Sequence, residues 1–291
     1  AAYRRVNIMT YVIDPTNKNL TPARNLKWEV STDVNIGGNR LSVTLFRENM
    51  TSGFRSQSYY APYTYKWYDT SGIDADALVG PPSLDGLPYE LRKELMGYSY
   101  YTNGSQTLKR GVEYTFSSRR IEKLMTRLTI NGAWFRTTYR NSMVETYRPS
   151  AVIGNKQIQY VGYYKNDGGS MNEMLNTNFT LDTDIPRLKL GFSISAQCLW
   201  YTMKQNTEVS NYPTSYMDND GVMHDWKEGD ENDLYLKYLV RTYSAGYYAL
   251  SRVPFSMNVN FKVTKKLFAD RLNIALFCNK LLDYTPDFIF W

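Results

Sequence analysis

The sequence predicts an all-β protein built from antiparallel strands. Apolar and polar residues alternate along most of the chain, which is the period of a β-strand with two unlike faces. Turn-forming residues separate these alternating stretches in pairs, as in hairpins. No run of about 18 consecutive apolar residues occurs, which excludes a transmembrane helix.

The first hairpin is predicted at residues 26–36 and 40–48. Five residues of its first strand share one face: Trp28, Val30, Thr32, Val34 and Ile36. The residues between them are all polar, so the two faces differ clearly. Gly37 and Gly38 then offer the positive φ values that a tight hairpin turn requires.

Three more hairpins follow the same pattern. Their strands are predicted at 107–117 and 124–136, at 174–182 and 187–201, and at 254–263 and 271–282. The last strand places Leu272, Ile274, Leu276 and Cys278 on one face. Connections within hairpins are short, whereas about 58, 37 and 52 residues separate successive hairpins, so the long connections all leave the same end of the sheet. Within the first of them, residues 85–97 are predicted as a short helix.

Two architectures fit this pattern. In a soluble β-sandwich the apolar face would be core, and strands would average about five or six residues. Several strands here reach roughly ten to thirteen residues, the length that crosses a bilayer at a tilt. Aromatic residues lie near strand ends, and long connections lie at one end only. These features favour a transmembrane antiparallel β-barrel with long extracellular loops, in which residues 1–291 supply about eight strands.

The composition excludes several functional classes. Two cysteines and one histidine leave no CxxC, HExxH or other zinc-ligand spacing. A disulfide between Cys198 and Cys278 stays open, since both also suit apolar strand positions. The net charge of +6 is dispersed, without an arginine-rich arm, so no nucleic-acid partner is expected. No nucleophile motif, phosphate loop or dinucleotide fingerprint is present, and we expect no enzymatic activity and no catalytic residue.

Two stretches resemble a known family. RNLKWEVSTDVNIGGNRLSVTLFREN resembles a barrel hairpin of TonB-dependent outer-membrane receptors of the Bacteroidota type, the SusC-like superfamily. LFADRLNIALFCNKLLDYTPDF resembles the penultimate barrel strand of the same receptors. The match to that strand rests on five positions: Asn279, Leu281, Asp283, Tyr284 and Pro286. The resemblance covers most of 24–48 and 254–288 and is loose between them.

The resemblance implies a function and partners. Such receptors have 22 strands, so this chain would be the C-terminal part of the barrel. The implied partners are an N-terminal plug domain absent from this chain, the TonB complex, outer-membrane lipid and, in some relatives, a surface lipoprotein lid. The implied function is import of a nutrient, which would be a glycan, a peptide, or an iron chelate or cobalamin. A non-transporting adhesin or structural barrel, an independent eight-stranded barrel and a soluble carbohydrate-binding sandwich are the alternatives.

Aromatic loop residues are the first candidate ligand-binding site. Tyrosine accounts for 26 residues of the chain, and many gather in the long connections. The candidates are Tyr59, Tyr60, Tyr63, Tyr65, Trp67, Tyr68, Tyr100, Tyr101, Tyr163 and Tyr164. Tyrosine gives contact area and a hydroxyl at low entropy cost, which suits glycan, peptide or partner binding. Packing between loops is the alternative role.

An acidic stretch in the third long connection is the second candidate site. Asp218, Asp220, Asp225 and Asp230 could supply oxygen ligands to calcium. The EF-hand register fails, because Tyr216 would stand where that loop requires an aspartate. A solvated acidic loop without metal is the alternative, and no other cofactor is expected.

Overall fold

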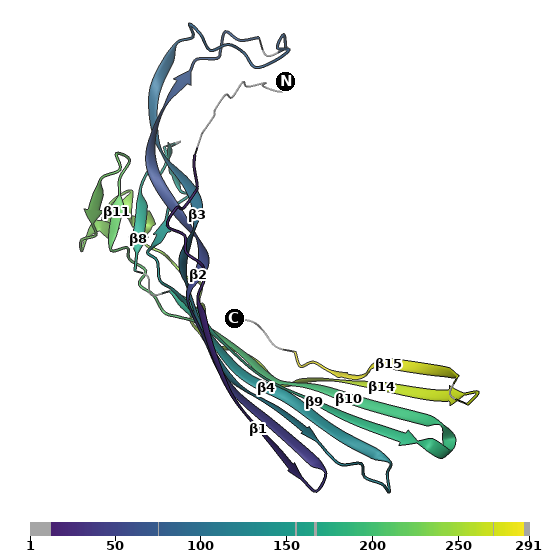
Figure 1. The fold of residues 1–291 in the computed structure, drawn as a ribbon. Coiled ribbons are helices and arrows are strands. Elements are labelled where there is room, and N and C mark those ends of the chain that lie inside the picture. The colour runs from purple at the N-terminus through teal and green to yellow at the C-terminus, as the bar shows by residue number, and fades with distance from the viewer. Residues whose placement is uncertain (1–12, 75, 155, 166–167, 270, 288–291) are drawn as a thin grey trace.

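A computed structural model describes residues 13–74, 76–154, 156–165, 168–269 and 271–287. One large antiparallel sheet dominates it, and two small sheets form from the connections. Figure 1 shows the large sheet as a curved single layer, with the small sheet that contains β8 and β11 beside the lower part of the β2–β3 ribbon. Within the described residues, no helix is long and apolar enough to span a membrane.

Eight principal strands form the large sheet in chain order. They are β1 (Asn25–Ile36), β2 (Asn39–Tyr68), β3 (Tyr89–Ser117), β4 (Thr126–Asn141), β9 (Gly169–Ile185), β10 (Leu190–Asn206), β14 (Ser256–Leu267) and β15 (Leu272–Tyr284). Each is antiparallel to its neighbours, and β13 (Ser251–Val253) adds a short pairing to β10. A strand therefore occupies each predicted range, and the predicted all-β antiparallel fold is confirmed.

The connections contain shorter elements. One small sheet has the order β12 (Met223–Asp225), β11 (Ser215–Met217), β8 (Val161–Tyr164) and β5 (Glu145–Tyr147). The other pairs β6 (Val152–Ile153) with β7 (Lys156–Gln157). Three short 3-10 helices complete the described chain: η1 (Pro186–Leu188), η2 (Asp230–Asn232) and η3 (Leu236–Leu239).

The predicted helix at 85–97 is wrong. Strand β3 begins at Tyr89 and pairs with β2 as far as Tyr68, so much of the first long connection is a two-stranded ribbon. Helix formers such as Glu90, Leu91 and Lys93 occupy this strand because every residue gains a ladder partner across the ribbon. Pairing of this kind outweighs a local helix propensity of a few tenths of a kcal/mol per residue.

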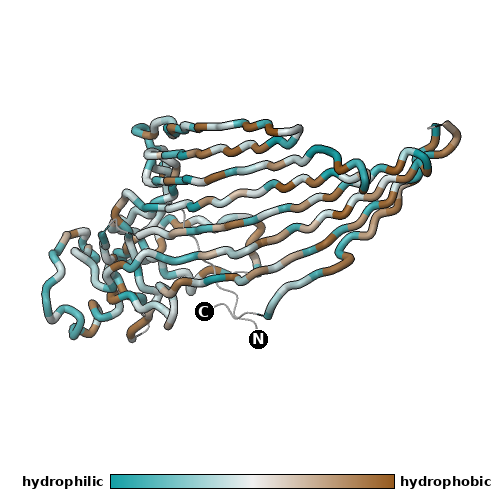
Figure 2. The backbone as a smooth tube through the Cα atoms, turned by 90° about the horizontal axis from the view of Figure 1, so that it is seen from below, coloured by the Kyte–Doolittle hydropathy of each residue, from teal (hydrophilic) through white to brown (hydrophobic). Residues whose placement is uncertain are grey.

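Outside the upper β2–β3 ribbon, register places most apolar residues of the eight strands on one face, which we call the apolar face; Phe46, Phe135 and Phe277 are exceptions. One row of cross-strand partners contains Val34, Leu41, Phe116, Ile130, Phe179, Ala196, Val259 and Leu282. The next row contains Thr32, Val43, Tyr114, Gly132, Thr177, Cys198, Met257 and Tyr284. Figure 2 shows the resulting alternation of hydrophobic and hydrophilic residues along the strands.

The opposite face, called the polar face, carries hydroxyls, amides and charges. Ser31 and Thr44 share a hydrogen bond of 2.9 Å across β1 and β2. Asn178 donates its side-chain amide to Asn131 across β9 and β4 at 3.0 Å. Such cross-strand pairs hold the sheet together on its polar side without an apolar core.

The apolar face is not covered by the described chain. Ile36 and Leu276 are each 71% exposed, although both belong to this face. A cluster of buried apolar side chains forms instead between the β2–β3 ribbon and the small sheet, from Leu95, Val161 and Met217. A soluble sandwich would need a second sheet over the apolar face, and the described residues place none there.

The two cysteines are free in this structure, so the open question of a disulfide is answered for this state. Cys198 is buried in β10 and Cys278 is half-buried in β15. Both belong to the apolar face, since Cys198 pairs with Met257 and Cys278 pairs with Phe261. They act as small apolar side chains.

Gly132 offers a test of how closely β3, β4 and β9 pack. A Cβ at Gly132 would overlap the backbone oxygen of Asn176 and the hydroxyl of Tyr114. We expect Gly132→Ala to destabilise the sheet by about 1–3 kcal/mol, the usual cost of overpacking. Gly191→Ala is the control, because its Cβ would meet no atom closer than 3.9 Å. Thermal unfolding followed by far-ultraviolet circular dichroism measures both, and equal midpoints would contradict the packing described.

Candidate functional site

The upper half of the β2–β3 ribbon sorts the candidate aromatic residues onto two faces. One face presents a row that we call the aromatic row: Tyr59, Tyr63, Tyr65, Trp67, Tyr98 and Tyr100. The rings of Tyr59 and Tyr98 are 5.2 Å apart, and those of Tyr63 and Tyr65 stack at 6.1 Å. Tyr63 and Trp67 remain more than a third exposed, so the row is open to a ligand.

Charged groups flank the aromatic row. The guanidinium of Arg92 lies 4.2 Å from the ring centre of Trp67. The hydroxyl of Tyr65 donates to Glu94 at 3.0 Å. This combination of flat apolar rings with a cation and a carboxylate can hold a ligand by stacking and by directed hydrogen bonds.

The opposite face of the ribbon packs against the small sheet. Tyr60 and Tyr163 pack on the buried cluster of Leu95, Val161 and Met217. The hydroxyl of Tyr163 donates to the sulfur of Met217 at 3.8 Å, and burial raises its pKa. These two tyrosines therefore serve packing between the connections, which is the alternative that the sequence left open.

Three further candidates lie outside the aromatic row. Tyr164 is 1% exposed, and its hydroxyl donates to the carbonyl of Leu239, so it is a packing residue. Burial also raises the pKa of Tyr164. The ring of Tyr68 lies 5.6 Å from that of Tyr89 on the face of the ribbon opposite the aromatic row. Tyr101 is 64% exposed but also lies away from the aromatic row, because it pairs with Ser56.

The four candidate calcium ligands have separate protein partners or lie apart. Asp218 contacts His224 Nε2 at 2.7 Å and accepts the amides of Asp220 and Val222. Asp220 forms an ion pair with Lys93 of the ribbon, and Asp230 accepts the amide of Lys227. In the described part of the chain, no group of three or more metal-ligating side chains is brought together. Asp225 has no role in the turns just described, and calcium binding stays a prediction.

Glu145 anchors the connections to the sheet. Its carboxylate pairs with Arg241 at 3.0 Å and with Arg55 at 3.4 Å, and it accepts a hydrogen bond from Asn141 at 3.1 Å. The guanidinium of Arg241 also stacks 3.8 Å over the ring of Tyr164. One half-buried carboxylate thus joins β2, the end of β4, β5 and the 207–250 connection. Sequence reasoning missed it, because these partners are up to 96 residues apart.

A polar pocket of about 280 Å³ lies beside this anchor. Arg55, Gln57, Asn141 and Glu145 are among its lining residues. The side-chain oxygen of Gln57 is buried without a hydrogen-bond partner in the described structure. The pocket offers donors and acceptors at the base of the ribbon, below the aromatic row.

A tyrosine cluster that the sequence analysis did not select lies in the third long connection. The ring of Tyr243 is 4.7 Å from that of Tyr247 and 5.2 Å from that of Tyr248. Burial raises the pKa of Tyr243 to about 12, against the opposing effect of Arg241. Gln205 and Asn206 at the end of β10 donate to the backbone beside these rings. The cluster therefore packs the connection onto β10, and the YSAGYY spacing was its only sequence signal.

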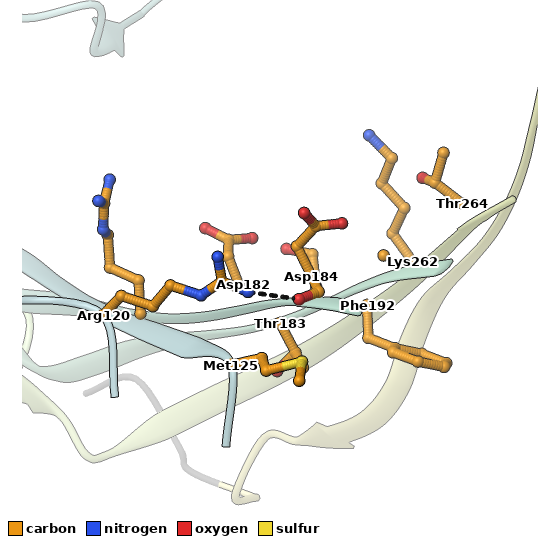
Figure 3. A pocket seen from close by; sticks show the side chains of 11 residues that line it. Arg120, Met125, Asp182, Thr183, Asp184, Phe192, Lys262 and Thr264 are labelled. Carbon is orange, nitrogen blue, oxygen red and sulfur yellow. Dashed lines mark hydrogen bonds between the residues drawn. The ribbon is translucent and has the colours of Figure 1, made fainter. Parts of the chain in front are cut away.

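A second polar pocket, of about 400 Å³, lies at the short-turn end of the sheet. Figure 3 shows Asp182, Asp184 and Lys262 on one side of the strands, with Phe192 and Met125 directed to the other. The charged residues belong to the polar face, where Arg127 lies directly opposite Asp182 in the register. Arg120 closes the pocket by donating to the carbonyl of Asp184 at 2.8 Å.

Comparison with known proteins finds no matching family model, no similar curated protein and no similar solved structure. The functional conclusion therefore rests on the sequence and the geometry of this chain.

Glu145 provides a test of how the connections are held. Glu145→Gln removes the charge shared by Arg55 and Arg241, and we expect a loss of about 1–3 kcal/mol because both guanidiniums lose their counter-charge in a half-buried site. Limited proteolysis should then cut within 207–250 faster than in the wild type. Glu29→Gln is the control, since its ion pair with Lys27 is about half exposed on both sides and contributes about 0–1 kcal/mol. Equal cleavage of both variants and the wild type would contradict the anchor.

The stability of the turn around Asp218 should depend on pH. The hydrogen bond from His224, helped by the amides of Val222 and Asp220, lowers the pKa of Asp218. The ionised carboxylate therefore stabilises the turn above the ordinary aspartate pKa of about 3.9, and this contribution is lost as the pH falls through the lowered value. Hydrogen-exchange protection of residues 216–226, normalised to the unstructured chain, should drop in that range. Asp218→Asn should abolish the drop, and a variant with an unchanged drop would refute this cause.

Proposed function

We propose that this chain is part of the wall and outer surface of a β-barrel transporter in a Gram-negative outer membrane. The observation that carries the proposal is the apolar face, which is continuous over eight strands and exposed. Exposed apolar patches on soluble proteins rarely exceed a few hundred Å². The hydrocarbon core of a bilayer is a medium in which such a face is stable.

The inclination of the strands supports this proposal. Val34 and Val259 belong to the same row of cross-strand partners. Val34 comes two residues before the C-terminal end of β1, whereas Val259 comes eight residues before the C-terminal end of β14. Six strand spacings separate β1 from β14. At about 3.4 Å per residue and 4.8 Å per spacing, the sheet edge is staggered by about 35°. Strands of membrane barrels tilt by about 35–45°.

The free edges of the sheet support a larger barrel. Within the described chain, neither β1 nor β15 has a partner on its outer side. Unpaired backbone groups at a lipid-exposed edge cost several kcal/mol each, so a membrane sheet must close. The resemblance to TonB-dependent receptors supplies the closing strands and a plug domain. The polar face and its charged pocket would then line the lumen and meet that plug.

The aromatic row is the surface we assign to ligand capture. It stands on the ribbon at the long-connection end of the sheet, which the proposal directs to the cell exterior. Rings flanked by Arg92 and Glu94 suit a glycan or a peptide, and an iron chelate or cobalamin is the further class that the resemblance offers. The chain contributes no chemistry of its own. The TonB complex supplies the energy, and a surface lipoprotein would close over the ligand.

Uptake by cells that display the intact protein tests the proposal. Glycans, peptides and iron chelates are supplied with and without a protonophore. We expect one class to accumulate in the cells and expect the protonophore to stop accumulation while surface binding remains. Tyr63→Ala combined with Trp67→Ala should weaken surface binding about tenfold, since two aromatic contacts of about 0.5–1.5 kcal/mol are lost.

Tyr101→Ala is the matched control, because Tyr101 is exposed but lies outside the aromatic row. It should bind the ligand as the wild type does. Binding without accumulation under either condition would overturn transport and favour the non-transporting adhesin. If the double variant binds the ligand as strongly as the wild type, the aromatic row is not the ligand-binding surface.

A further inference from the structure

Three arginines form a continuous row on the apolar face, at its border toward the long connections. Arg47 of β2 lies directly opposite Arg110 of β3, and Arg110 lies directly opposite Arg136 of β4. One row nearer the short turns, the same face carries Leu45, Val112 and Trp134, and one row nearer the long connections it carries Asn49, Leu108 and Thr138. We call these three residues the arginine row.

The arginine row forms no ion pair within the described part of the protein. Like charges directly opposite one another destabilise a sheet, because partner side chains start only about 4.5–5.5 Å apart. Within the described residues, none of the three forms a side-chain hydrogen bond or ion pair. Glu173 lies opposite Arg136, but its carboxylate accepts the indole N–H of Trp134 and the hydroxyl of Tyr201, both at 2.9 Å.

The position of the row indicates which anion would balance it. Below it, the apolar face continues without a break through Leu45 and Val112. Trp28 lies opposite Arg47 at the β1 end of the row, and Trp134 lies one row below Arg136, so two indole rings adjoin the arginines. A partner that fits both surfaces has an anionic head at the arginines and hydrocarbon chains along the apolar residues.

We infer that the arginine row binds the phosphate headgroups of lipids in the leaflet nearest the long connections. This inference rests on the proposed membrane placement of the sheet. A guanidinium presents a planar fork of donors that matches phosphate oxygens two at a time. Three adjacent forks would hold a phosphate-rich headgroup and relieve the repulsion between the strands. The occupant is a lipid rather than free phosphate, because only a lipid also covers the adjoining apolar face.

Native mass spectrometry of the intact protein tests the inference. The protein is reconstituted into vesicles of phosphatidylcholine alone, and into vesicles with equal amounts of phosphatidylcholine and phosphatidylglycerol of the same chain length. After release from mixed vesicles, the wild type should carry phosphatidylglycerol in preference to phosphatidylcholine. The R47Q/R110Q/R136Q variant should lose at least about fivefold of this preference, and R47K/R110K/R136K should keep a weaker one.

The matched control is K109Q/R127Q/K262Q, which removes the same charge from the polar face of the sheet. Its preference for phosphatidylglycerol should equal that of the wild type. Two results would overturn the inference and leave the proposed function intact. One is a wild-type protein that inserts into both vesicles without a lipid preference, and the other is an equal lipid preference in the wild type and all variants. A wild-type protein that fails to insert into either vesicle would overturn the proposed function, and the inference with it.

Discussion

The cross-strand register is the constraint on which the rest of this structure depends. Side chains alternate strictly along a strand, so a slip of one residue in any pair would move a whole strand's apolar set to the other face. The eight strands keep their apolar residues aligned from Val34 on β1 to Leu282 on β15. Irregularities in the ladder are confined to a few places. At the bulge in β15 opposite Asn260, the residues before and after the bulge, Cys278 and Leu282, still lie on the apolar face.

One consequence of this register is a sheet without a core. The described chain places no second layer on the apolar face, and buried apolar contacts lie in the connections instead. The free energy of the sheet therefore depends on what covers that face. The stability of the sheet therefore depends on its surroundings, because burial of apolar surface contributes roughly 25 cal/mol per Å² only when water is removed from that surface.

Much of the sheet could be predicted from the sequence, and the reason is local. In stretches such as 27–36 the apolar and polar residues alternate cleanly, so strand position and facing follow from the residues alone. The upper ribbon could not be predicted. In residues 59–68 aromatic side chains occupy both faces, because one face packs on the small sheet while the other is the aromatic row. Its partner strand contains helix formers, which misled the local interpretation.

The candidate site was predictable only as a list of residue types. Strand pairing showed that five of the ten aromatic candidates share the aromatic row, whereas Tyr60 and Tyr163 pack on the cluster of Leu95 and Val161 and the other three lie elsewhere. Glu145 and the arginine row gave no local signal, since each depends on contacts between distant segments. Sequence alone identifies a strand's faces, but it does not say which charges meet across neighbouring strands.

Spin labels placed singly along β9 from 175 to 182 would test the central claim most directly. With Cys198 and Cys278 replaced by alanine, each labelled protein is reconstituted into vesicles and probed with oxygen, which dissolves in lipid, and with a water-soluble nickel chelate. We expect a period of two: labels at Leu175, Thr177, Phe179 and Leu181 respond to oxygen, and the intervening ones respond to the nickel chelate. An equal response to the nickel chelate from labels on both faces would contradict the claim that the apolar face lies in lipid.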